Sequence, residues 1–161
     1  MRPAFTLIEL IFVIVIIGVL SAVAMPKFKN LIDNSQIASE LATASSVQSA
    51  IDAVHGEWIT NTCAFEWGNG QNTNTASAEF NASGYPTAAE MGDTLNPFNK
   101  LLKNTENGDW KRVDMGGTIL PRYYGPATNS GAKDRNLPHK PEGNDYWEYN
   151  ATLGTFKLIE P

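Results

Sequence analysis

The distribution of apolar and polar residues divides the chain into a short apolar segment and a long polar remainder. The 21 residues at positions 5–25 carry a single charge, Glu9. As a helix this segment rises about 31 Å, close to the roughly 30 Å hydrocarbon thickness of a bilayer. We therefore predict one membrane-spanning helix joined to a polar domain, which excludes a purely soluble protein.

Beyond residue 25 the apolar residues recur at the three- and four-residue spacing of an amphipathic helix. The predicted stripe consists of Leu31, Ile32, Ala38, Leu41, Ala42, Ala50, Ile51 and Val54, with the acids Asp33, Glu40 and Asp52 outside it. Gly56 is the predicted C-cap. The sequence thus predicts one helix from Phe5 to Val54, with a membrane half (5–25) and an amphipathic half (26–56).

Two residues weaken the middle of this predicted helix. Pro26 removes one backbone hydrogen bond, and Gly18 lies eight residues before it. The stretch between them either bends or melts when many copies are bundled, or it forms an ordinary tolerated kink. Sequence alone leaves both alternatives open.

Residues 57–161 show the pattern of a small globular head. Residues 57–86 have a loop composition, with Trp58, Phe65 and Trp67 expected against the helix. Residues 87–90 predict a capping box that opens a short helix, and residues 96–102 predict a further turn. Residues 125–144 predict a long surface loop, because they are rich in Gly, Pro, Asn and Lys.

Two β-hairpins complete the predicted head. Residues 110–115 and 118–124 predict the first, with Pro121 confining the second strand to a sheet edge. Residues 145–150 and 155–160 predict the second, in which Trp147 and Tyr149 face Phe156 and Leu158 and cover the helix stripe. The predicted fold class is α+β, a long N-terminal transmembrane helix packed on a small C-terminal antiparallel β-sheet.

Composition and candidate chemistry argue against an enzyme. Twelve basic and 17 acidic residues give a net charge of −5, which argues against nucleic-acid binding. Cys63 is the only cysteine, so no intrachain disulfide can form, and a free buried thiol is expected. His55 and His139 have no ligand neighbours at metal-binding spacing, and residues 68–70 do not open a helix as a phosphate loop would. We therefore expect no catalytic site and no cofactor.

Glu9 decides how the apolar segment is interpreted. A carboxylate in a transmembrane helix costs about 2.5–3.5 kcal/mol on insertion scales, so it needs a partner or a role. A simple single-pass anchor has no use for it. Neither has a secretory signal peptide, although residues 22–24 form an A-x-A site after an apolar run. A further alternative is that Glu9 snorkels to the lipid headgroups.

The run from Ala4 to Leu10 (A-F-T-L-I-E-L), followed by an apolar helix that reaches Pro26, resembles the N-terminus of type IV prepilins and type II secretion pseudopilins. The resemblance implies cleavage by a prepilin peptidase between Ala4 and Phe5, with residues 1–4 as the leader, and N-methylation of Phe5. Gly18 and Pro26 stand where the family usually has Gly and Pro. Ala4 departs from the family's usual Gly, which bears on cleavage efficiency.

The resemblance also implies a partner for Glu9. Cleavage creates an α-amino group on Phe5, whose ordinary pKa of about 7.7–8.0 keeps it largely protonated near neutral pH. Glu9 of one subunit can pair with the Phe5 amine of a neighbour when two helices pack in a stagger. This pair removes two uncompensated charges from lipid, and it therefore favours assembly.

Taken with this resemblance, the sequence predicts a structural subunit of a type IV filament. The lack of a cysteine pair and the modest head favour a type II secretion pseudopilin of a periplasmic pseudopilus. The alternatives are a true type IV pilin of a surface pilus, serving adhesion, motility or DNA uptake, and a secreted or anchored binding module. Expected partners are other pilin-like subunits, the prepilin peptidase and an inner-membrane assembly platform.

The expected location is the bacterial inner membrane, with the head in the periplasm before extraction into a filament. Charge does not settle this orientation, because Arg2 precedes the apolar segment while Lys27 and Lys29 follow it. Some major pseudopilins hold calcium in a C-terminal loop, and Asp134, Glu142 and Asp145 could supply oxygen ligands here. The alternative is that these are solvated loop acids.

The mass of the purified chain separates the filament subunit from the exported module. A filament subunit is expected to begin at methylated Phe5, whereas cleavage as a signal peptide would give a chain that begins at Met25. Intact-protein mass spectrometry distinguishes the two.

Replacement of Ala4 tests the cleavage site itself. Because peptidase recognition requires a small residue before the cut, Ala4→Arg is expected to leave the uncut precursor in the membrane. Normal maturation of this variant, as judged by immunoblot, would rule out the bond between Ala4 and Phe5 as the cleavage site.

Overall fold

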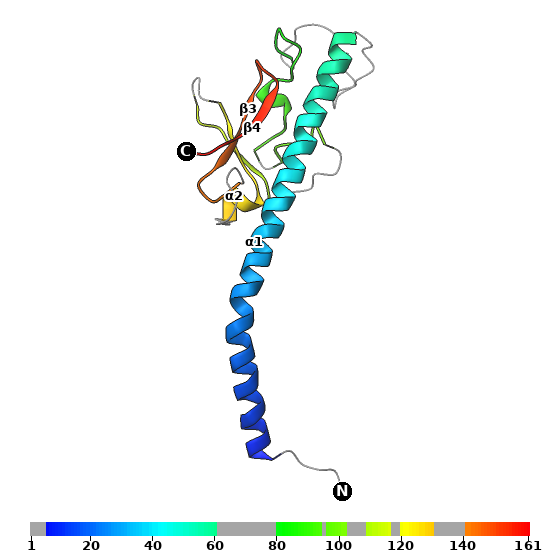
Figure 1. The fold of residues 1–161 in the computed structure, drawn as a ribbon. Coiled ribbons are helices and arrows are strands. Elements are labelled where there is room, and N and C mark those ends of the chain that lie inside the picture. The colour runs from blue at the N-terminus through cyan, green and yellow to red at the C-terminus, as the bar shows by residue number, and fades with distance from the viewer. Residues whose placement is uncertain (1–5, 61–79, 95, 103–108, 117–119, 131–140) are drawn as a thin grey trace.

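The computed structural model describes residues 6–60, 80–94, 96–102, 109–116, 120–130 and 141–161, and these form one long helix and one antiparallel sheet (Figure 1). In chain order the elements are α1 (Leu7–Thr60), the 3₁₀ turn η1 (Ala88–Glu90), β1 (Lys111–Val113), β2 (Arg122–Tyr124), α2 (Pro126–Ser130), β3 (Tyr146–Asn150) and β4 (Thr155–Ile159). This arrangement confirms the predicted α+β class.

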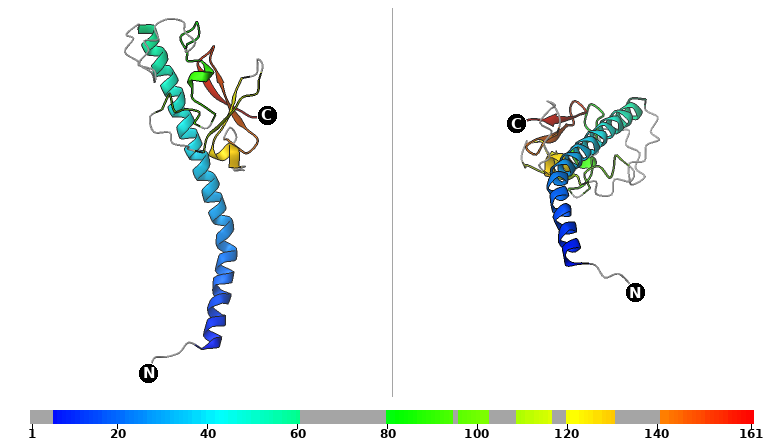
Figure 2. Two further views of the ribbon diagram at one scale, coloured as in Figure 1. Left: turned by 180° about the vertical axis from the view of Figure 1, so that it is seen from behind. Right: turned by 60° about the horizontal axis from the view of Figure 1, so that its bottom comes forward.

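Helix α1 is continuous from the N-terminal end of the molecule to the top of the head. Its first half projects away from the sheet, and its second half lies along the head (Figures 1 and 2). Pro26 lies inside the helix and does not end it. The predicted end at Gly56 is wrong, because the helix continues to Thr60, whose hydroxyl donates to the Gly56 carbonyl at 3.1 Å.

The face of α1 that packs on the head differs in part from the predicted stripe. The buried positions are Ile37, Glu40, Ala44, Val47, Ile51 and Val54. The prediction was correct for Ile51 and Val54. It was wrong for Leu31 and Ile32, which are 65% and 56% exposed. These two residues continue the exposed apolar surface of the first half of the helix.

The four strands form a meander in the order β1-β2-β3-β4, with every neighbouring pair antiparallel. The strand pairing of both predicted hairpins is confirmed, although β2 covers only residues 122–124 of the predicted 118–124. In the second, Trp147 pairs with Leu158 and Tyr149 with Phe156. The prediction that Pro121 confines β2 to an edge is wrong, because β2 lies between β1 and β3. Pro121 precedes the first residue of β2, so its missing N–H does not interrupt the strand's ladder.

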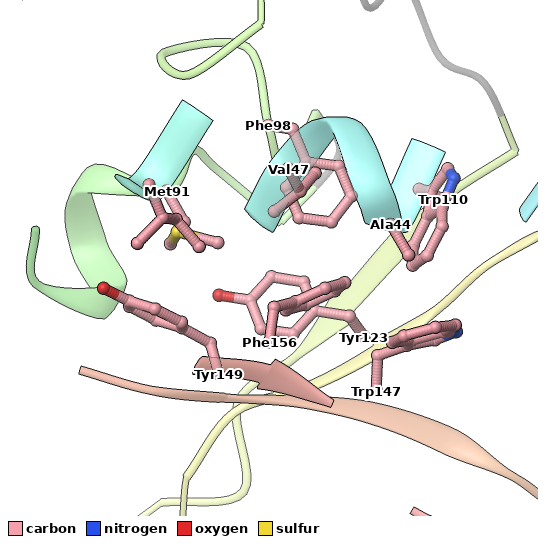
Figure 3. Packing of buried hydrophobic residues seen from close by; sticks show 10 residues of the cluster. Ala44, Val47, Met91, Phe98, Trp110, Tyr123, Trp147, Tyr149 and Phe156 are labelled. Carbon is pink, nitrogen blue, oxygen red and sulfur yellow. The ribbon is translucent and has the colours of Figure 1, made fainter. Parts of the chain in front are cut away.

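The core of the head lies between the inner face of the sheet and α1 (Figure 3). It consists of Ala44, Val47, Ile51, Met91, Phe98, Trp110, Tyr123, Trp147, Tyr149 and Phe156. Stacking of the Trp147 and Phe156 rings, with centroids 5.2 Å apart, joins β3 to β4. The Tyr149 hydroxyl donates to the Pro86 carbonyl at 2.7 Å, and burial raises the pKa of this hydroxyl, so it stays protonated.

The connection between α1 and the sheet contributes short turns to this core. The turn predicted at residues 96–102 is confirmed and carries the buried Phe98. The capping box predicted at residues 87–90 is wrong, because Thr87 makes no side-chain capping bond and only the 3₁₀ turn η1 forms. Arg112 of β1 holds η1 in place, since its Nη1 donates to the Ala88 and Gly92 carbonyls at 2.9 Å each.

Glu40 lies at the polar centre of the interface between α1 and the head. The sequence placed it outside the apolar stripe, and this is wrong, because the side chain is fully buried. Its Oε2 accepts hydrogen bonds from the backbone N–H groups of Ala127 (2.7 Å) and Thr128 (3.1 Å). Its Oε1 accepts one from Nε1 of Trp147 at 2.7 Å. One carboxylate therefore joins α1 to α2 and β3.

The segment around α2 is built to receive this carboxylate. A Cβ at Gly125 would lie 2.4 Å from the Glu40 carboxyl carbon, so a side chain there would displace it. The Gly125 N–H donates to the Thr128 hydroxyl at 2.7 Å, which closes the turn. The prediction of a surface loop from residue 125 is therefore wrong for residues 125–130, which hold α2 and include the buried Ala127 and Thr128.

Removal of the Glu40 carboxylate should destabilise the head strongly. Glu40→Ala leaves three buried donors without an acceptor, at about 1–3 kcal/mol each. We expect a loss of several kcal/mol, and a smaller loss for Glu40→Gln, which keeps one acceptor oxygen. Urea unfolding of the full chain in detergent micelles, followed by tryptophan fluorescence, measures the effect.

Asp52→Ala is the matched control, because Asp52 is an exposed acid on the same helix whose carboxylate accepts only an exposed i, i+4 bond from Nε2 of Gln48 at 3.0 Å. This change should alter the free energy of unfolding by no more than about 0.5 kcal/mol. Equal effects of Glu40→Ala and Asp52→Ala would contradict the role of Glu40.

Candidate functional site

Exposed apolar side chains gather on the first half of α1. From Leu7 to Ile32 nearly every large apolar residue is between 42% and 76% exposed, and we call residues 7–32 the apolar arm. Among the described residues, α1 is the one helix that is long and apolar enough to cross a membrane. Soluble monomers rarely expose apolar patches of more than a few hundred Å². The arm therefore requires lipid or other protein surfaces around it.

Thr6 and Glu9 define the start of the arm. The Thr6 carbonyl accepts the first helical bond, from Leu10 N–H at 3.2 Å, and the Thr6 hydroxyl oxygen accepts from Glu9 N–H at 3.3 Å. Thr6 is thus the N-cap and Glu9 the third helical residue, the T-x-x-E spacing of a capping box. Sequence reasoning missed this cap, although the spacing is visible in the chain.

The position of Glu9 is favourable for a carboxylate even before any partner is present. An acidic side chain in the first turn lies at the positive end of the helix dipole. The side chain is exposed, and no hydrogen bond or ion pair joins its carboxylate to another described residue. It is therefore free to meet a cation on a neighbouring molecule.

Of the other residues predicted for processing and helix weakening, only Gly18 and Pro26 lie within the described part of the chain. Ala4 and Phe5 lie outside the described residues, so the cleavage site and the amine partner of Glu9 stay predictions. Gly18 and Pro26 lie within continuous helix, and a Cβ at Gly18 would meet nothing within 4 Å. In a single subunit these residues therefore do not break α1.

The residues predicted to bind calcium are only partly described. Asp134 lies outside the described residues. Asp145 is buried, and its Oδ2 accepts from Glu142 N–H at 2.8 Å, while Asp145 N–H donates to the Glu142 carbonyl at 3.0 Å. The Asp145 carboxylate and the Glu142 backbone thus close a turn before β3. Within the described ranges no group of three or more His, Cys, Asp and Glu side chains is placed to hold a metal ion.

The remaining residues considered for chemistry have structural roles where they are described. The His55 ring stacks on Tyr85 with centroids 3.9 Å apart, and its Nδ1 lies 3.2 Å from the Gly84 carbonyl. Trp58 belongs to α1 and packs beside Val54 and Phe80. Cys63, Phe65, Trp67, residues 68–70 and His139 lie outside the described residues.

Comparison with known proteins identifies relatives of the arm and of part of the head. A family model described as a prokaryotic N-terminal methylation motif matches residues 2–25. The chain is 38% identical over 96 residues to the type IV narrow pilus major component PilA5 of Thermus thermophilus, which covers 58% of this chain and 82% of that protein. It is 32% identical over 93 residues to the type IV major fimbrial protein FimA of Dichelobacter nodosus, covering 57% of this chain and 58% of that one.

A third relative extends further along this chain. The type IV major pilin protein PilE1 of Neisseria gonorrhoeae is 30% identical over 124 residues, covering 72% of this chain and 55% of the relative. The chain thus spans a little over half the length of the Dichelobacter and Neisseria proteins. No solved structure matches the chain significantly.

Proposed function

Because this chain belongs to the type IV pilin-like family, we propose that it is the structural subunit of a type IV pilus and polymerises through its apolar arm. The observation that carries the proposal is the exposed apolar arm with a single carboxylate near its start. The three relatives are pilus and fimbrial proteins, which favours a pilus over the pseudopilus that the sequence suggested. Their names also describe structural components, in keeping with the expectation that this chain is not an enzyme.

A pseudopilus of a type II secretion system is the second candidate. The chain contains a single cysteine, so it cannot close the intrachain disulfide loop found in many pilins. Both candidates require the same path for the subunit. It is inserted in the inner membrane with its head in the periplasm, cleaved and methylated by the prepilin peptidase, and extracted by the assembly platform.

Assembly follows from the electrostatics of the arm. In lipid, an isolated Glu9 carboxylate costs up to about 2.5–3.5 kcal/mol, the value at the centre of a membrane helix, and the Phe5 ammonium adds its own cost. Pairing the two between staggered subunits offsets both costs, while the apolar side chains exchange lipid for neighbouring arms. The stretch between Gly18 and Pro26, continuous in one subunit, then bends or unwinds as arms crowd in the filament core.

Replacement of Glu9 tests this mechanism. Glu9→Ala removes the intersubunit pair but makes the monomer more compatible with lipid, by up to about 2.5–3.5 kcal/mol. We expect the variant to accumulate in the membrane, folded and cleaved, and to lose most subunit crosslinks and all filaments. A photocrosslinking amino acid at position 16, in the exposed arm, reports the crosslinks at matched abundance.

Asp33→Ala is the matched control, since it removes one carboxylate from α1 outside the membrane-length segment. This variant should crosslink as the wild type does, and equal crosslink yields for Glu9→Ala would contradict the pairing mechanism. Mechanical shearing of intact cells separates the two candidate functions. A pilus subunit appears in the sheared fraction as filaments, whereas a periplasmic pseudopilus stays with the cells.

A further inference from the structure

The side of the sheet that faces away from α1 carries a pattern that filament assembly does not explain. Because side chains alternate along a strand, the residues between the core positions point outward. We call six of them the outer face: Lys111 of β1, Arg122 and Tyr124 of β2, Tyr146 and Glu148 of β3, and Lys157 of β4. All are exposed or partly exposed, and α1 lies on the opposite side of the sheet (Figures 1 and 2).

The outer face reverses the charge of the rest of the molecule. It holds three cations and one acid, a net charge of +2, on a chain whose net charge is −5. No ion pair joins Arg122 or Lys157 to Glu148 within the described residues, although Glu148 pairs in register with both. Asp114, which directly follows β1, forms an ion pair with Arg112, with Oδ1 2.8 Å from Nε. The net negative charge of the whole chain, which argued against nucleic-acid binding, therefore does not describe the charge of this surface.

Aromatic rings lie between these cations, on the two central strands. The Tyr124 and Tyr146 rings have centroids 6.4 Å apart, and the Arg122 guanidinium carbon lies 4.1 Å above the Tyr146 ring. Lys111 pairs in register with Tyr124, so a cation flanks the tyrosines at the β1 side as well. Aromatic rings and guanidinium planes on a sheet are surfaces on which unpaired bases stack, and flanking cations pair with the backbone phosphates.

We propose that the outer face binds single-stranded nucleic acid, with bases stacked on Tyr124 and on the Arg122 guanidinium that covers Tyr146, and with phosphates paired with the three cations. Single strands fit better than a duplex, because the bases must be unpaired to reach the ring faces. The site is complete within one subunit. It therefore does not depend on the filament, and the two proposals fail independently.

Fluorescence anisotropy of a labelled 20-nucleotide oligothymidylate tests the site, with the full chain held in nanodiscs of zwitterionic lipid. Three phosphate contacts predict a slope of about −2 for log K against log salt concentration. Arg122→Gln should weaken binding and reduce the slope by about 0.7. Lys100→Gln is the matched control, because it removes one cation of the head that pairs with Glu90 outside this face, and it should leave binding unchanged.

Two variants at one position isolate stacking. Tyr124→Ala should weaken binding by about fivefold or more, whereas Tyr124→Phe keeps the ring and should bind as the wild type does. An abasic oligomer of the same length should bind at least as weakly as the thymidylate does to Tyr124→Ala, because it loses stacking at every position of the face. Thermal unfolding of each variant checks that the head is folded.

Several results would overturn the proposal. Equal affinity for the abasic oligomer would show that bases are not recognised. Equal or tighter binding of dextran sulfate or of a polyglutamate peptide would indicate a general polyanion or acidic-protein surface instead. An equal loss from Lys100→Gln would show that binding follows overall charge, and no detectable binding at low salt would remove the site altogether.

Discussion

The placement of the head on the helix depends on the buried carboxylate of Glu40. The apolar core supplies most of the driving force for packing, but that force is non-directional and tolerates small shifts. The Glu40 oxygens instead require three donors at fixed positions, two on the first turn of α2 and one on Trp147. Those backbone donors in turn need an acceptor, because the first N–H groups of a helix have no partner within it. The carboxylate and its three donors therefore satisfy one another in only one placement of the head on α1.

The contact between Glu40 and the head divides α1 into two regions with different surroundings. Above it, one face of the helix is buried under the sheet, and the remaining faces carry small and polar side chains apart from the exposed Ile59. Below it, the apolar arm is exposed on all sides, so its surroundings must come from lipid or from other subunits. The proposed filament uses this division. The arm supplies the polymer core, and the head folds around its own aromatic cluster without help from a neighbour.

The sheet separates two further tasks by the two-residue period of its strands. On β3, Trp147 and Tyr149 point into the core, whereas Tyr146 and Glu148 lie on the outer face. The same five residues therefore seal the head against α1 and present rings and charge to the outside. A substitution on the outer face should thus leave the core intact, which is why that surface can be altered without loss of the fold.

Much of this protein is determined by local sequence pattern. The apolar run, the helical spacing after it and the strand alternation around residues 151–154 predicted the long helix, the second hairpin and the α+β class, because each signal lies within a few residues of the element that it specifies. The cap formed by Thr6 and Glu9 is equally local, so that part of the candidate site could also be predicted from the sequence.

Only the tertiary structure decided which acid of α1 is buried, where β2 sits in the sheet and that residues 126–130 form a helix. Glu40 looks like a solvated acid in the helical pattern, because the donors that satisfy it lie 87, 88 and 107 positions away along the chain. The burial of a charge is compensated only by partners in space, and the periodicity of one segment contains no information about them.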